Sequence, residues 1–313
     1  MLPSDHTPCL ITISTRIPRA KIFRFENYWL LDEQFPQILN SAWQTPLNSN
    51  LDKAKVMIAK FKILRKKLKE WQASKTGLHT TIANSRLVLQ MLEHFEEFRD
   101  LSIHEWNFKE LRRHLVTLLE QQRVYWKQRG TIKWATLGDA RTKFFHNNAT
   151  IKFRKSLITE LESSDGSIAL DHRQKEAILW KDFKERLGTS EFQGFQVDPT
   201  LFIQPSSRLH SLENPFQHEE IDNIIKALPN DKSPGPDGFN NEFLKKCWPV
   251  IKFDFYDLCR DFYNHNVCLS SINSSFITLI PKVEVARRVN EFRPISLLNS
   301  SVKLITKLLA NRL

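Results

Sequence analysis

The spacing of hydrophobic residues predicts helices along most of this chain. Between residues 51 and 129 apolar positions recur every three or four residues, and Leu111, Leu115, Leu118 and Leu119 form one apolar stripe with charged residues opposite. No proline interrupts the region. The pattern is typical of a helical hairpin that serves as a connector, and equally of the core of a helical bundle.

Shorter elements flank this region. Residues 9–13 are a β-type run, and a helix is expected over about 28–43. Residues 156–170 predict two short strands joined by a Ser-Asp-Gly turn, and a helix is expected over about 171–187.

The last hundred residues predict a series of alternating elements. Apolar residues at helical spacing indicate a short helix over 218–228, and the turn residues Ser-Pro-Gly-Pro-Asp-Gly follow at 233–238. Asn240 is placed to cap a helix that runs to about 265. A strand is expected over 276–280 and a helix over 300–312. The predicted fold class is therefore α+β, mostly helical.

The positive net charge of the chain suggests a binding partner. The net charge is +11, and residues 51–160 hold 23 Lys and Arg against 11 Asp and Glu, so this stretch carries the whole excess. Such a balance favours a polyanion, either nucleic acid or an anionic membrane surface, although a helical protein also carries lysines that are merely solvated. No apolar run reaches the ~20 residues that span a bilayer. We therefore expect a nuclear or cytoplasmic protein without a membrane partner; its oligomeric state is not indicated.

Four blocks near the C-terminal end carry a family resemblance. They are LPNDKSPGPDGFNNE at 228–242, LIPK at 279–282, EFRPISL at 291–297 and KLITKLLANRL at 303–313. In this order and spacing they resemble the start of the reverse transcriptase of LINE-type (non-LTR) retrotransposons, of a plant-like kind. The resemblance implies that residues 216–313 are the N-terminal, fingers part of a right-hand polymerase.

The resemblance also implies two contacts to the substrate. Arg293 would bind the phosphates of the incoming nucleotide, and Lys282 would bind those phosphates or the template; a planar guanidinium and an ammonium suit this task. The alternative is a surface lysine and an arginine paired with Asp or Glu. The 233–238 segment is expected to be a structural turn.

Further basic residues that could contact nucleic acid precede these motifs in the sequence. Residues 138–146 (GDARTKFFH) resemble the connector of the same polyproteins, where a basic, aromatic helix could hold RNA. The alternative for this segment is that Phe144 and Phe145 lie in a core while Lys143 is solvated. For the basic run at 65–69 the alternative is a solvated helix face. The candidates for nucleic-acid contact are Arg65, Lys66, Lys67, Lys69, Arg141 and Lys143.

The first residues resemble a second enzyme. Ser4–Pro8 (SDHTP) is similar to the closing motif of the endonuclease/exonuclease/phosphatase fold, in which His acts on the scissile phosphate and Asp orients it. The metal-binding residues of that fold are not among the 313, so Asp5 and His6 are interpreted as vestigial. The predicted domains are an endonuclease remnant at 1–45, a basic helical connector at 46–190, a linker at 191–215 and the fingers part at 216–313.

Polymerisation needs two Mg²⁺ held by palm aspartates, and in this family those motifs follow the helix at 300–312. The 313 residues contain no such pair, and Asp254 and Asp257 are interpreted as solvent-facing acids. The sequence therefore predicts a fragment of an RNA-directed DNA polymerase, inactive as it stands, with no metal or cofactor in this chain and with RNA template and DNA target as partners. One alternative is a non-catalytic nucleic-acid-binding protein that uses the basic connector. Another is a chain that exposes too much apolar surface to fold stably.

Overall fold

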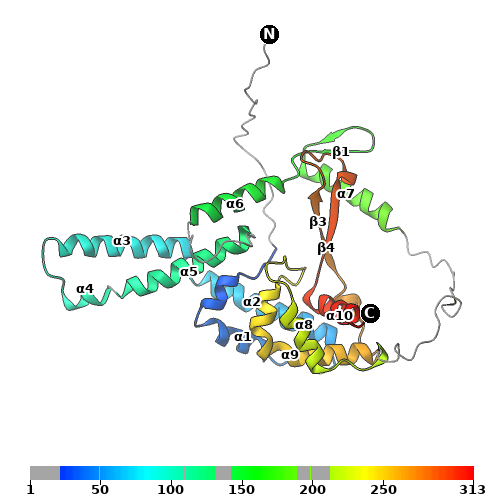
Figure 1. Ribbon diagram of the computed structural model, residues 1–313, viewed down its shortest axis with the longest axis horizontal. Coiled ribbons are helices and arrows are strands. Elements are labelled where there is room, and N and C mark those ends of the chain that lie inside the picture. Colours follow the sequence, from blue (N-terminus) through cyan, green and yellow to red (C-terminus); the bar gives the residue numbers. More distant parts are fainter. Residues whose placement is uncertain (1–21, 49, 109, 131–141, 189–197, 199–211) are drawn as a thin grey trace, which may run out of the picture.

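A computed structural model describes residues 22–48, 50–108, 110–130, 142–188, 198 and 212–313 (Figure 1). The predicted mostly helical α+β class is confirmed. In chain order the elements are η1 (Asn27–Leu31), α1 (Phe35–Trp43), α2 (Lys53–Ala73), α3 (Leu78–Glu96), α4 (Ile103–Phe108), α5 (Leu111–Gly130), α6 (Thr142–Lys155), β1 (Leu161–Glu162), β2 (Ile168–Ala169), α7 (His172–Leu187), α8 (His218–Ala227), α9 (Asn241–Tyr263), η4 (Leu269–Ser271), β3 (Ser275–Pro281), η5 (Val289–Glu291), β4 (Phe292–Leu298) and α10 (Ser300–Arg312). No helix within these residues is long and apolar enough to cross a bilayer.

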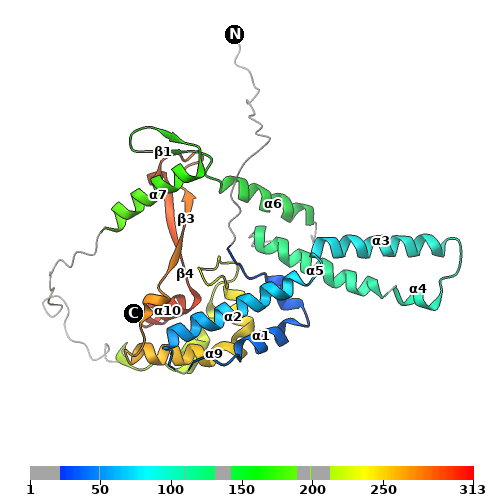
Figure 2. The same cartoon turned by 180° about the vertical axis from the view of Figure 1, so that it is seen from behind.

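The main core joins the two ends of the described chain. It is built by residues 23–29 together with α1, α2, α8, α9 and α10, which lie side by side in Figures 1 and 2. Phe25 is fully buried, and its ring centroid lies 5.0 Å from that of Phe243 in α9. The Phe25 N–H donates to the Gly238 carbonyl at 2.8 Å. Residues predicted to come from an endonuclease remnant therefore share one core with residues predicted to begin a polymerase.

The two acids of α9 are only partly exposed and pair with lysines of α2, whereas our interpretation of the sequence places them in solvent. Asp254 accepts hydrogen bonds from the Trp43 indole N–H and from Lys60, both at 2.7 Å. Asp257 accepts from Lys53 at 2.8 Å. Both acids face α2 because that helix packs against α9. Their role is to join the two helices.

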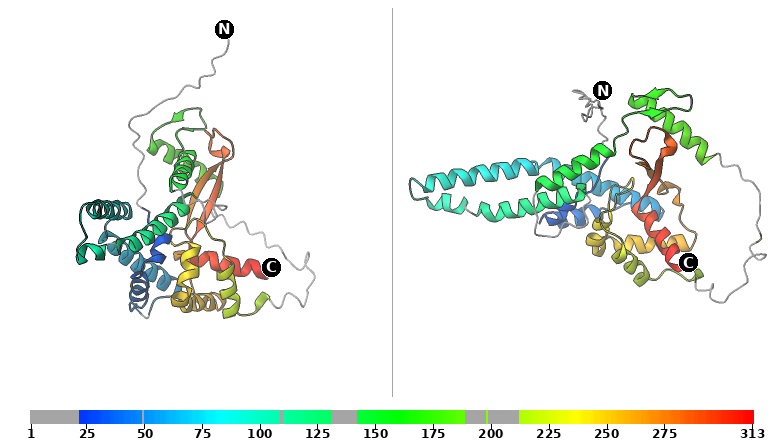
Figure 3. Two further views of the ribbon diagram at one scale, coloured as in Figure 1. Left: turned by 60° about the vertical axis from the view of Figure 1, so that its left-hand side comes forward. Right: turned by 45° about the horizontal axis from the view of Figure 1, so that its top comes forward.

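A helical arm, residues 78–130, projects from the core (Figures 1 and 3). Its helices α3 and α5 pack against each other through Ile82, Leu89 and Leu92 on one side and Leu118 on the other. The helices expected over 51–129 are thus confirmed, and both alternatives apply to different parts of the region. α2 belongs to a bundle core, whereas α3 to α5 form a hairpin.

The single helix expected over 28–43 is wrong, because the chain forms η1 and α1 with a break between them. Pro36 is the physical reason: it lacks an N–H and its ring would clash with the carbonyl of residue 32 in a continuous helix. Near the start of a new helix the same proline is well tolerated, and it occupies the first turn of α1.

The turn at 233–238 anchors the start of α10, as its predicted structural role requires. Gly238 has φ +83°, a conformation that favours glycine. The Asp237 carboxylate accepts the Ser300 N–H at 2.5 Å, and the Asp237 N–H donates to the Asn299 side chain at 2.8 Å. Burial raises the pKa of Asp237, an effect opposed by its hydrogen bonds from Ser300. A residue 63 positions earlier therefore supplies the cap of α10.

Candidate nucleotide and nucleic-acid interface

The β3–β4 hairpin carries both predicted nucleotide contacts. The strands pair antiparallel from Ser275↔Leu298 at the base to Pro281↔Phe292 near the loop. The sequence indicated β3 but not β4, since Pro294 argues against a strand. A two-stranded sheet has only edge strands, so the missing N–H of Pro294 does not interrupt the hydrogen bonds of an inner strand.

Arg293 and Lys282 lie near the loop end of this hairpin. Arg293 is opposite Ile280. Lys282 comes two positions after Ile280, just past the end of β3, and side chains two positions apart along an extended chain point to the same face. Lys282 therefore lies diagonally across from Arg293. Arg293 is exposed and forms no ion pair with any residue that the structure describes. Lys282 is exposed too, and its ammonium donates to the Asn290 carbonyl at 2.7 Å. The hairpin thus presents two neighbouring cations to solvent.

The loop of this hairpin is held by a capping unit, residues 157–187, which contains β1, β2 and α7. Arg287 pairs with Glu160 at 2.6 Å, and Arg288 pairs with Glu162 at 2.8 Å. The Glu162 N–H also donates to the Arg287 carbonyl at 2.8 Å. The hydrogen bond from Arg288 lowers the pKa of Glu162. Beneath these pairs lies a small second core of Leu161, Val289 and Phe292, flanked by Ile158, Ile178, Leu179, Leu279 and Ala286.

The capping unit confirms the predicted strand pair and the predicted helix after it. β1 and β2 are joined through Gly166, whose φ is +83°. Asp171 caps α7 by accepting the Arg173 N–H at 2.9 Å. Its contact with the hairpin loop, more than a hundred residues later, was not predicted.

Replacing Leu161 with alanine should release the capping unit from the hairpin. Leu161 is fully buried in a core of only three buried residues, so we expect a local cost of about 2 kcal/mol, at the low end for leucine. Hydrogen–deuterium exchange should accelerate in 158–179 and 285–292 and stay unchanged in α9. Leu170→Ala, at a side chain that is 68% exposed, is the matched control. Unaltered exchange in 285–292 would contradict the described docking.

The basic residues of the connector separate into different environments. Lys67 donates to the Ser41 carbonyl at 2.9 Å and so lies against α1. Arg65, Lys66 and Lys69 lie on another side of α2. Arg65 is near the base of the hairpin, where it lines a pocket with Ser274 and Asn299, whereas Arg293 lies near the loop end. The predicted candidates are therefore not one continuous site.

Several of the residues predicted to be functional lie outside the part of the chain that the structure describes. Asp5, His6, the strand at 9–13 and Arg141 are outside the described residues, and so are most of the linker at 191–215 and the side chains of Lys143, Phe144 and Phe145. Their roles stay predictions.

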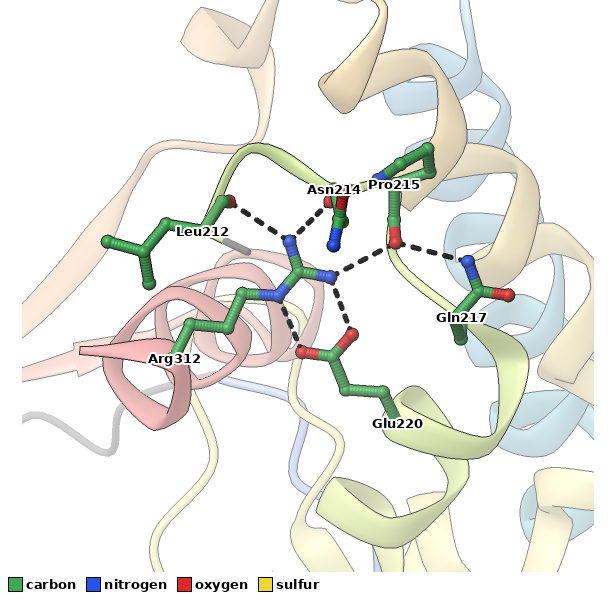
Figure 4. A pocket seen from close by; sticks show the side chains of 6 residues that line it. All are labelled: Leu212, Asn214, Pro215, Gln217, Glu220 and Arg312. Atoms are coloured by element: carbon green, nitrogen blue, oxygen red, sulfur yellow. Dashed lines mark hydrogen bonds and ion pairs between the residues drawn. The ribbon is translucent and has the colours of Figure 1, made fainter. Parts of the chain in front are cut away.

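A pocket of about 480 Å³ surrounds a structural contact between α10 and the segment before α8 (Figure 4). The Arg312 guanidinium binds both carboxylate oxygens of Glu220 at 2.7 and 2.8 Å and donates to three backbone carbonyls at Leu212, Asn214 and Pro215. The bond from Arg312 lowers the pKa of Glu220. Because its donors are already engaged, Arg312 fixes the end of α10 to α8, a role that the sequence did not indicate.

Comparison with known proteins gives one informative similarity. No protein-family model matches the chain. Over 330 aligned residues the chain is 23% identical to the transposon TX1 uncharacterized 149 kDa protein of Xenopus laevis, and the alignment covers 99% of this chain. This similarity supports a retrotransposon origin for the chain. The chain spans 24% of the length of that relative.

Proposed function

We propose that the chain supplies the fingers part of the RNA-directed DNA polymerase of a LINE-type retrotransposon. The family motifs at 228–313 and the similarity to a transposon protein support this proposal. The observation that carries it is the exposed Arg293 guanidinium, which lies near Lys282 toward the loop end of the hairpin and has no ion pair within the described chain. RNA template and DNA target are the proposed partners.

The chemistry of these two side chains suits a triphosphate. A guanidinium offers a planar fork that donates two parallel hydrogen bonds to phosphate oxygens. Lys282 spends one of its three donors on Asn290 and keeps two for phosphate or template. The capping unit restrains the loop between them, which lowers the entropy lost when the hairpin binds a substrate.

Catalysis would need more than this. The paired aspartates that hold Mg²⁺ are not supplied by these 313 residues, so the proposed contribution is nucleotide and template contact rather than the chemical step. We expect no nucleotide incorporation by the purified chain alone. Metal-dependent incorporation by this chain would overturn that part of the proposal.

Replacing Arg293 with alanine tests the nucleotide contact. A hydrogen bond to a charged group contributes about 1.5–3 kcal/mol, so affinity for a fluorescent deoxynucleoside triphosphate should fall roughly 10-fold or more. Arg293→Lys should give an intermediate loss, because the charge remains while the fork is lost. Fluorescence anisotropy of the labelled triphosphate provides the measurement.

Arg260→Ala is the matched control, since it removes an exposed arginine of α9 that pairs with Asp257 at 2.6 Å and lies outside the hairpin and the capping unit. The proposal fails if the unaltered chain binds no triphosphate, or if Arg260→Ala and Arg293→Ala weaken binding equally.

A further inference from the structure

We propose that the outer side of α2 binds the phosphate backbone of a single-stranded nucleic acid through Lys62, Arg65, Lys66 and Lys69. This outer face of α2, defined by those four residues, is separate from the Arg293 end of the hairpin. The inference assigns a surface to the nucleic-acid partner of the proposed function, and for the identity of that partner it rests on that function.

One flank of α2 has its lysines engaged in contacts with neighbouring helices. Lys53, Lys60 and Lys67 follow one another at intervals of seven residues and share a face. Lys53 and Lys60 form ion pairs with the acids of α9 at 2.8 and 2.7 Å, and Lys67 donates to the Ser41 carbonyl. These three cations serve the packing of α2 against α1 and α9.

The outer face is arranged differently. With about 100° per residue, its four cations fall within an arc of about 100° and extend over roughly 10 Å of the helix. Lys62, Arg65 and Lys69 form no ion pair within the described chain. Lys66 comes only within 3.9 Å of Glu70, which is itself exposed. The face therefore presents a nearly uncompensated positive charge.

This arrangement costs the helix some stability. Lys62 with Lys66, and Arg65 with Lys69, are like charges at i and i+4, which repel each other across one turn. A polyanion would remove that repulsion and release its own counterions as it binds. The charge complementarity indicates a polyanion, and the pocket beside Arg65 favours nucleic acid over an anionic membrane surface.

A pocket beside Arg65 favours a single strand over a duplex. It has a volume of about 150 Å³ and lies between α2, the 233–238 turn and the base of the β3–β4 hairpin. Its walls combine apolar side chains with hydroxyl and amide groups: Met57, Ile58, Phe61, Arg65, Pro236, Asp237, Ser271, Ile272, Ser274, Asn299 and Ser301. An unpaired strand can turn a base into such a pocket without breaking a base pair while its phosphates follow the helix, whereas a duplex would first have to unpair that base.

The test is the salt dependence of binding to a fluorescent single-stranded RNA oligomer, measured by anisotropy between about 50 and 200 mM salt. In the test variant Lys62, Arg65, Lys66 and Lys69 are all replaced with Gln. With about 0.7 per phosphate contact, the slope of log K against log salt should become shallower by roughly 2 to 3. Affinity at the lower salt concentration should fall at least about 10-fold.

A matched variant removes the same number of positive charges elsewhere, by substituting Gln for the exposed lysines Lys184, Lys226, Lys232 and Lys246. It should keep the original slope. Thermal melting separates binding from folding, because the outer-face variant loses like-charge repulsion and should melt no lower than the unaltered chain.

Equal losses in the two quadruple variants would show only a general charge effect and would overturn the proposal. Duplex RNA of the same sequence that binds as tightly as the single strand would also overturn it. Arg293→Ala should leave the salt slope unchanged, so failure of the nucleotide contact and failure of this inference can be told apart.

Discussion

Replacing Gly235 with alanine should destabilise the chain by more than about 3 kcal/mol. A Cβ at this position would lie 2.1 Å from the Leu298 carbonyl oxygen, 2.4 Å from the Leu298 carbonyl carbon and 2.8 Å from the Asn299 nitrogen. All three atoms belong to the backbone, so no side-chain rotation can relieve the overlap. The junction between β4 and α10 would have to move away from the 233–238 turn.

That movement would also break the contacts that the turn makes with α10. Asp237 would lose the Ser300 N–H, and Asn299 would lose the Asp237 N–H. The free energy of unfolding from urea titration measures the total effect, and hydrogen exchange should localise the first opening to α10.

Gly77→Ala is the control for the intrinsic effect of a methyl group. The added Cβ would meet nothing closer than the Thr80 hydroxyl at 3.9 Å, so the change should stay below about 1 kcal/mol. If Gly235→Ala proved as stable as the control, the close approach of the turn to β4 would not exist in solution.

Replacing Phe25 with alanine should cost roughly 3–5 kcal/mol. Its ring is fully buried, with ring centroids 5.0 Å from Phe243, 5.3 Å from Trp29 and 5.7 Å from Phe35. The cavity would form between the N-terminal segment and α9. Urea unfolding followed by tryptophan fluorescence would report it, because Trp29 lies beside the new cavity.

Ile22→Ala, at a side chain that is 44% exposed three residues earlier, should change stability little. The result also tests the organisation of the chain. A small effect of Phe25→Ala would mean that residues 23–29 do not belong to the cooperative unit that contains α9.

The positions of the helices could be predicted where a single stripe of apolar residues at helical spacing marks the buried face. The series Ile221, Ile224, Ile225 and Leu228 in and after α8 was sufficient, and Asn240 capped α9 as expected by accepting the Phe243 N–H at 3.0 Å. The break in the first helix follows from Pro36 and could have been predicted from that residue. β4 was missed because Pro294 is excluded from inner strands but not from a two-stranded hairpin.

The arrangement of charges could not be predicted in the same way. Whether a lysine of α2 forms an ion pair depends on which flank of the helix packs against α1 and α9. The spacing of residues in the sequence does not predict which flank that is. Lys67 was grouped with Arg65 for this reason, and Lys62 was overlooked. Likewise nothing local connects Glu162 with Arg288, which lie 126 positions apart.

The core that joins residues 23–29 and α2 to α8, α9 and α10 has a consequence for synthesis on the ribosome. Phe25 leaves the exit tunnel more than two hundred residues before Phe243, and at about 5–20 residues per second that delay is roughly 10–40 s. Throughout this interval the apolar side of α2 has no partner from α9 to cover it. We therefore expect the nascent chain to be open to chaperone binding during elongation, and a pause in translation between α2 and α9 to lengthen its exposure to aggregation or degradation.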